Sequence, residues 1–241
     1  MQLRLALAFA AICGLSFTSC SPSTSHGADT PDEFMDVMAA VQELSDHMPA
    51  SAEEALGFLL EGNTRFVTGE PEHSHQTIAR RMKLTDGQHP CAVVLTCADS
   101  RVVPELIFDI GLGDLFVIRV AGNVVAEDEA GSIEYAVEHL DVPLVIVLGH
   151  ESCGAVTAAL GGGEDDFDEL TRLLGRLGPP LEDVDRQLPM AQQIKRGVEA
   201  NVRYSVTQLR GLLSHGGHVP EDLKIVPAVY ELETGRVRVL N

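Results

Sequence analysis

Four short runs of the chain are apolar at nearly every position: Ala92–Thr96, Leu115–Val120, Leu144–Leu148 and Ile225–Tyr230. Such runs are typical of β-strands that are buried on both faces. The intervening segments repeat apolar residues with helical spacing, at Ser132–Leu140, Ala155–Leu160 and Ala191–Leu213. Strands that alternate with helices form parallel sheets. The pattern therefore predicts an α/β fold, with a mostly parallel central sheet covered by helices on both faces.

Smaller signals extend this prediction. Residues 51–54 form a capping box, which predicts a helix through Phe66 that Gly69 ends. Residues 161–190 are rich in Gly, Asp and Pro, and we expect an excursion from the core with one short helix at about Phe167–Leu177. Residues Arg236–Leu240 follow a Thr-Gly turn and predict an added edge strand.

The N-terminal segment has a different character. Residues 1–20 combine one positive charge, an apolar run to about Phe17 and a small polar end, which predicts a signal peptide at 1–19. The run is shorter than the roughly 20 apolar residues of a membrane-spanning helix. Its end resembles a bacterial lipoprotein signal, which would make Cys20 the lipidated first residue; simple cleavage nearby is the alternative. We expect an exported protein of the cell envelope or periplasm, attached to membrane only through this lipid.

The rest of the chain divides into a spacer and a folded body. Residues 20–30 carry no apolar period and predict a flexible spacer. From Pro31 an amphipathic helix opens a single α/β domain, 31–241. The 17 Lys+Arg and 36 Asp+Glu residues give a formal charge of −19, which argues against nucleic acid as a partner. Five cysteines are too few for a disulfide scaffold of 241 residues.

Candidate chemistry follows two of the predicted strands. Cys97, Asp99 and Arg101 come after the first strand, and His150 and Cys153 come after the third. Functional groups of an open α/β sheet collect beyond the carboxyl ends of its strands. Two thiolates and one imidazole suit tetrahedral zinc and leave its fourth position open. The joint occurrence of these residues predicts one zinc ion per chain.

Other Cys and His residues have simpler interpretations. Cys91 precedes an apolar strand and is expected to be a small buried side chain. His73, His75 and His89 fall in predicted loops, where we expect them to be solvated.

The candidate ligands belong to four longer motifs: C-A-D-S-R at 97–101, R-V-A-G-N at 119–123, S-I-E-Y-A-V at 132–137 and G-H-x-x-C-G at 149–154. Together these motifs resemble the β-class carbonic anhydrases, over about residues 51–230. The resemblance implies that zinc is bound by Cys97, His150 and Cys153. It also implies a dyad of Asp99 with Arg101 beside the metal.

The resemblance extends to the substrate pocket and the assembly. It implies that the substrate side is formed by Gln88, Phe116, Tyr135 and Gly154. In the family these pockets form across a dimer interface, which implies a homodimer or tetramer. The implied reaction is the reversible hydration of carbon dioxide to bicarbonate and a proton.

A mechanism follows from these roles. Zinc lowers the pKa of bound water from about 15.7 toward about 7, so hydroxide can attack carbon dioxide at neutral pH. Asp99 accepts the hydrogen of that hydroxide, so that a lone pair of the oxygen points at carbon, and Arg101 keeps Asp99 ionised. In some family members the aspartate itself becomes the fourth zinc ligand, and the sequence leaves this open for Asp99.

Three alternatives remain at this point: hydrolysis of COS or CS₂, a zinc-holding scaffold without turnover, and a bicarbonate sensor. The Asp99–Arg101 pair favours an enzyme, because a purely structural zinc needs no dyad. The family's bicarbonate-inhibited members use a tryptophan in their regulatory site, and this chain has none.

Overall fold

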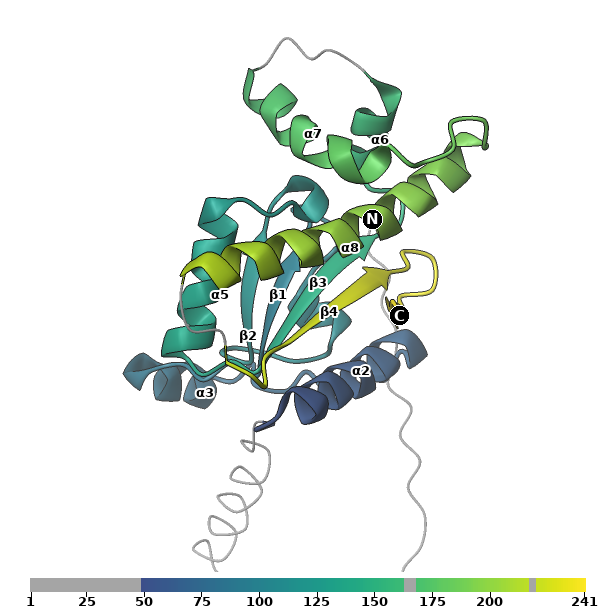
Figure 1. Ribbon diagram of the computed structural model, residues 1–241. Helices are drawn as coiled ribbons and strands as arrows, with labels where there is room; N and C mark the ends of the chain where they lie inside the picture. The colour runs from purple at the N-terminus through teal and green to yellow at the C-terminus, as the bar shows by residue number, and fades with distance from the viewer. Residues whose placement is uncertain (1–48, 163–167, 217–219) are drawn as a thin grey trace, which may run out of the picture. The chain divides into compact units, whose positions relative to one another are not determined.

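The computed structural model describes residues 49–162, 168–216 and 220–241. Its centre is a five-stranded sheet in the order β2-β1-β3-β4-β5. Figure 1 labels the four strands β2, β1, β3 and β4. The strands are β1 Ala92–Thr96, β2 Leu115–Arg119, β3 Leu144–His150, β4 Lys224–Tyr230 and β5 Val237–Val239. The first four are parallel, and β5 pairs antiparallel with β4 at one edge. The predicted fold class and the predicted strands are confirmed.

The described helices are α2 Ala52–Thr68, α3 Ile78–Lys83, α4 Pro104–Ile107, α5 Glu127–His139, α6 Gly154–Gly161, α7 Asp168–Leu181 and α8 Met190–Gly216. The predicted caps of α2 are present: the Ser51 hydroxyl accepts a hydrogen bond from the Glu54 N–H, and Gly69 adopts a left-handed φ of 75°. The sequence analysis missed α3 and α4, because helices of six and four residues are too short to show a period. Within the described ranges no helix is long and apolar enough to cross a membrane.

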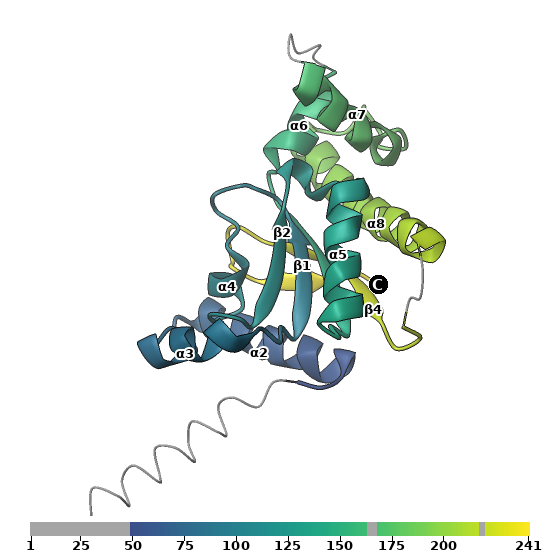
Figure 2. The same cartoon turned by 90° about the vertical axis from the view of Figure 1, so that its left-hand side faces the viewer.

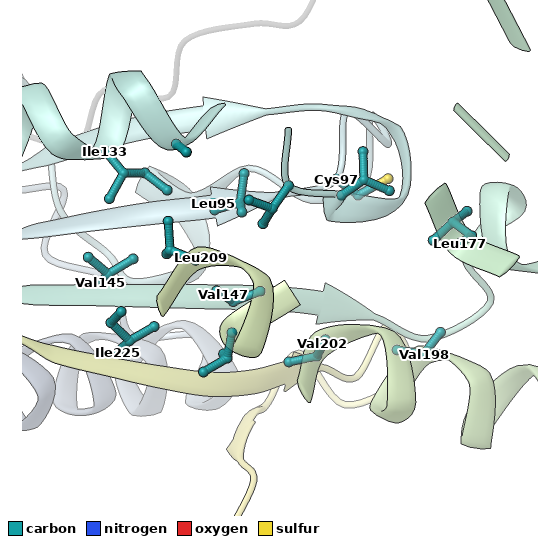
Figure 3. Packing of buried hydrophobic residues seen from close by; sticks show 14 of the residues in the cluster. Leu95, Cys97, Ile133, Val145, Val147, Leu177, Val198, Val202, Leu209 and Ile225 are labelled. Atoms are coloured by element: carbon teal, nitrogen blue, oxygen red, sulfur yellow. The ribbon is translucent and has the colours of Figure 1, made fainter. Parts of the chain in front are cut away.

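Each face of the sheet has its own apolar core. Alternate residues of β1 and β3 point to opposite faces, so Leu95 and Val147 pack with α5 and α8, whereas Val94 and Ile146 pack with α2 and α4. Figure 2 shows α2 and α8 on opposite sides of the strands. Figure 3 shows the first of these cores, with Cys97 at the end of β1. Burial on both faces explains why β1 and β3 are apolar throughout.

The excursion predicted after α6 is helical over more of its length than expected. Helix α7 extends four residues past its predicted end, and Pro179 and Pro180 lie in its last turns. Its buried face includes Leu177 and Leu181. The predicted signal peptide, the spacer and the helix at 31–48 lie outside the described residues.

One expectation about loop histidines was wrong. His75 is 8% exposed, and its Nδ1 lies 2.8 Å from both carboxylate oxygens of Asp114. The prediction failed because a carboxylate 39 positions away in the chain provides a buried partner that sequence spacing does not reveal. Cys91, in contrast, is buried as expected, and burial raises the pKa of its thiol to about 12.

Candidate metal centre

Two neighbouring strands bring the three predicted ligands together. Thr96 of β1 pairs with Leu148 of β3, so Cys97 and His150 leave the sheet at the same edge. Ser152 turns the chain with a left-handed φ of 54°, and Cys153 then precedes the first residue of α6. The ligand atoms of Cys97, His150 and Cys153 all lie within 4.8 Å of one another, and all three residues are buried.

The His150 ring is oriented for metal binding. Its Nδ1 lies 2.8 Å from the backbone carbonyl oxygen of Glu151, a contact in which the ring N–H donates. This tautomer leaves a lone pair on Nε2. Nε2 is buried and has no hydrogen-bond partner among the described residues. An unpartnered buried nitrogen costs free energy, and a metal ion would supply the missing bond.

The pKa values of the two thiols also favour binding of a cation. Contact with the Cys153 thiol lowers the pKa of Cys97, and the hydrogen bond from the Gly122 N–H lowers it further, although burial opposes both effects. The same thiol contact and burial raise the pKa of Cys153. The pair therefore releases its first proton easily, and a metal ion would replace the second.

The site fits zinc in donor type and in spacing. Tetrahedral ligands at about 2.3 Å from zinc lie roughly 3.8 Å apart, which small side-chain movements reach from the observed grouping. Sulfur and nitrogen donors select zinc over magnesium or calcium. Three protein ligands leave a fourth position open, the pattern of catalytic rather than structural zinc sites.

Asp99 and Arg101 form a bidentate ion pair beside this centre. Arg101 Nε donates to Asp99 Oδ1 at 2.9 Å, and Arg101 Nη2 donates to Oδ2 at 2.7 Å. These bonds hold the pKa of Asp99 far below its ordinary value. Asp99 Oδ2 also lies 3.8 Å from His150 Nε2. The carboxylate therefore stays ionised and borders the space where the metal would bind.

Two residues of the motif at 119–123, to which no role was predicted, contact the metal centre. Arg119 Nη2 donates to the backbone oxygen of Asp99 at 2.7 Å. The Gly122 N–H donates to Cys97 Sγ at 3.2 Å. Backbone contacts of this kind carry no side-chain signature, and only the motif as a whole pointed to this segment.

The predicted substrate residues do not surround the metal ligands of the same chain. Phe116 pairs with Val93, four strand positions before Cys97, which corresponds to about 13 Å along the strand. Tyr135 lies beside Phe116, with ring centroids 6.3 Å apart, and exposed Gln88 precedes β1. Gly154, in contrast, opens α6 directly after Cys153. One chain alone therefore provides the metal ligands, the dyad and Gly154 at one end of the strands.

Known proteins are similar to this chain in sequence and in fold. Residues 92–237 match the family model described as carbonic anhydrase. Carbonic anhydrase 2 of Mycobacterium tuberculosis is 42% identical over 185 residues, which cover 74% of this chain and 87% of that protein. The carbonic anhydrase of Mycolicibacterium smegmatis is also 42% identical, with 75% and 89% covered.

Solved structures extend the likeness to the fold. The β-carbonic anhydrase CcaA has a TM-score of 0.59 at 28% identity and covers 77% of this chain and 95% of its own. A tetrameric β-carbonic anhydrase from Sordaria macrospora has a TM-score of 0.62 at 25% identity, with 77% and 96% covered. The chain therefore belongs to the β-class carbonic anhydrases, zinc enzymes that hydrate carbon dioxide.

Proposed function

We propose that this protein hydrates carbon dioxide at a zinc ion held by Cys97, His150 and Cys153, with Asp99 and Arg101 orienting the reaction. The observation that carries the proposal is the buried Nε2 of His150, which has no hydrogen-bond partner in the described part of the chain. It lies next to two thiols and 3.8 Å from an ionised carboxylate. When bound, zinc lowers the pKa of water toward neutrality and so supplies a nucleophilic oxygen.

The dyad then has a defined task. Asp99 Oδ2 accepts a hydrogen from the attacking oxygen, so that the oxygen lone pair points toward carbon. Arg101 binds both oxygens of Asp99, which keeps the carboxylate ionised and fixes its direction. The same two bonds would restrain Asp99 from binding zinc directly, which would leave the fourth position to water.

The test is stopped-flow hydration of carbon dioxide with zinc measured in the same sample. Asp99→Asn should retain about one zinc per chain and lose roughly 100-fold or more of turnover, because the hydrogen acceptor is lost. The control is Asp183→Asn, at an exposed aspartate, which should behave like the wild type. Full turnover in Asp99→Asn would remove the dyad role. A zinc-loaded wild type that turns over only COS or CS₂, or nothing, would favour the alternative substrate or the scaffold.

We also propose a homodimer or tetramer whose pockets are completed by a second chain. Strand β2 is an apolar edge strand whose side chains are only partly buried, and Tyr135 next to it is 49% exposed. An open apolar edge of this kind favours pairing with another copy. The distance of Phe116 from Cys97 in one chain supports a pocket that needs a neighbour.

Mixing two inactive chains tests this assembly. Cys153→Ser removes a zinc ligand, and the double variant Gln88→Ala with Tyr135→Ala removes the substrate side. If each pocket spans two chains, mixed dimers regain one intact site, and activity rises to about a quarter of the wild type after random exchange. No gain in a mixture that forms mixed dimers would contradict the shared pocket.

Export to the cell envelope and lipidation of Cys20 are further proposals, supported by the residue pattern at 1–20. Expression of the full chain in a bacterial host with labelled palmitate tests both. Label in the membrane fraction should disappear with Cys20→Ala. Soluble, unlabelled wild-type protein would contradict lipidation.

A further inference from the structure

The segment after β2 contains an unusual turn next to the metal ligands. Gly122 and Asn123 follow each other in the left-handed region, with φ of 72° and 44°. Glycine adopts this conformation freely, whereas asparagine does so at a cost of roughly 1 kcal/mol. A turn with two such residues needs outside contacts to hold its shape.

This turn touches the metal centre through its backbone. The Gly122 N–H donates to Cys97 Sγ at 3.2 Å. An N–H donor withdraws electron density from a thiolate and fixes its direction, and both effects tune a bound metal. The position of Gly122 therefore affects what Cys97 offers to zinc.

Two side chains of α8 hold the turn. The Asn201 amide donates to the carbonyl oxygen of Gly122 at 2.7 Å, and the Ser205 hydroxyl donates to that of Asn123 at 3.1 Å. Asn201 and Ser205 lie one helical turn apart and are 1% and 2% exposed. On the other side, a Cβ at Gly122 would lie 3.2 Å from the side chains of Ala155 and Leu177, so the turn has little room to shift.

We infer that Asn201 is a positioning residue of the zinc site: it holds Gly122 so that the Gly122 N–H stays bonded to Cys97 Sγ, and Ser205 assists at the next carbonyl. Helix α8 thus contributes to the metal centre without providing a ligand. The inference rests on zinc binding by Cys97, His150 and Cys153.

A second buried asparagine offers a matched control. Asn63 of α2 is 4% exposed and donates to the carbonyl oxygens of Ile107 and Gly235 at 3.0 and 2.8 Å. Asn63 also accepts a hydrogen bond from the Val237 N–H at 2.8 Å. Within the described ranges, none of its hydrogen bonds involves a candidate metal ligand. Asn63→Ala and Asn201→Ala each remove one buried amide and leave backbone polar groups unpaired, so both should lower stability.

The experiment compares zinc release to a chelator and the spectra of cobalt-substituted protein. Asn201→Ala should release zinc roughly 10-fold faster or more, the usual effect of losing a partner that supports a ligand. Its thiolate-to-cobalt absorption band should shift to longer wavelength, because a thiolate with one hydrogen bond fewer gives up an electron more easily. Asn63→Ala should change neither readout. Ser205→Ala should change both in the same direction, and Ser205→Thr, which keeps the hydroxyl, should not.

Normal zinc release and an unshifted band in Asn201→Ala would overturn the inference. Equal changes in Asn63→Ala would do the same, because they would reflect general loosening of the fold. If Asn201→Ala does not fold, the Ser205 pair decides. A wild type that binds no zinc would instead contradict the proposed function, so the two failures are distinguishable.

Discussion

Two polar clusters in this molecule use burial in opposite ways. Asp114 is 0% exposed, and its carboxylate accepts hydrogen bonds from His75, from Arg80 and from the Gly111 N–H. At the metal edge His150 is equally buried, yet its Nε2 has no partner in the described part of the chain. A satisfied cluster stabilises the fold, whereas an unpaired buried atom indicates where a ligand completes the bonding.

A second unpaired atom supports this distinction. Asn123 Nδ2 is the other buried side-chain atom without a partner in the described ranges. It follows Gly122 in the turn that contacts Cys97. In the described ranges, the two buried side-chain atoms without a partner therefore belong to the candidate ligand His150 and to the residue that follows Gly122 in this turn.

The largest expected effect on the satisfied cluster comes from Asp114→Ala. It leaves Arg80 and His75 buried without their carboxylate, which should lower the free energy of unfolding by about 3–5 kcal/mol. Urea unfolding of the zinc-loaded protein measures this loss. Turnover per bound zinc should stay within about twofold of the wild type. A large drop in turnover with unchanged stability would show that the Asp114 cluster serves catalysis and not the fold.

Arg→Lys changes in the two clusters should affect turnover and stability separately. Arg101→Lys cannot make both bonds to Asp99, so turnover should fall roughly tenfold, or about 1.4 kcal/mol, with little change in stability. Arg80→Lys loses a similar pair of bonds, to Leu112 and Asp114. It should lower stability by about 1–2 kcal/mol and leave turnover intact. Stopped-flow hydration and unfolding of both variants show whether the two effects separate.

The smallest expected effect concerns pH. Burial raises the pKa of Asp109, but bonds from Arg65 and from the N–H groups of Glu72 and His73 outweigh it, and the net pKa is lowered. A lowered pKa gives stability that is present above the ordinary aspartate value and is lost as pH falls through the folded-state value.

Asp109→Asn should therefore flatten the acid side of the stability profile. The change in slope is limited to about 1.4 kcal/mol per pH unit, the value for one proton. Unfolding measured between pH 6 and pH 3 would reveal it. An identical slope in the variant would mean that other carboxylates account for the acid sensitivity.

The sequence was sufficient to predict the sheet and the grouping of the three candidate metal ligands. Strand β1 could be predicted to the residue because burial on both faces makes it apolar throughout, and Cys97 and His150 could be joined because parallel strands end at one edge. The roles of Asn201 and Ser205 could not be predicted, since their partners are backbone carbonyls 79 and 82 positions away. The buried contact between His75 and Asp114 could not be predicted for the same reason, because the two residues are 39 positions apart.

The division of the zinc ligands between β1 and β3 has a consequence for the order of folding. Cys97 and His150 are 150 − 97 = 53 positions apart, with all of β2 and α5 between them. Closing a loop of that length has an entropic cost that the β1–β3 pairing must first offset. The complete ligand set thus exists only after the centre of the sheet has formed. Zinc that binds all three residues would therefore be taken up after β1 and β3 have paired, and it would stabilise a sheet that is already assembled.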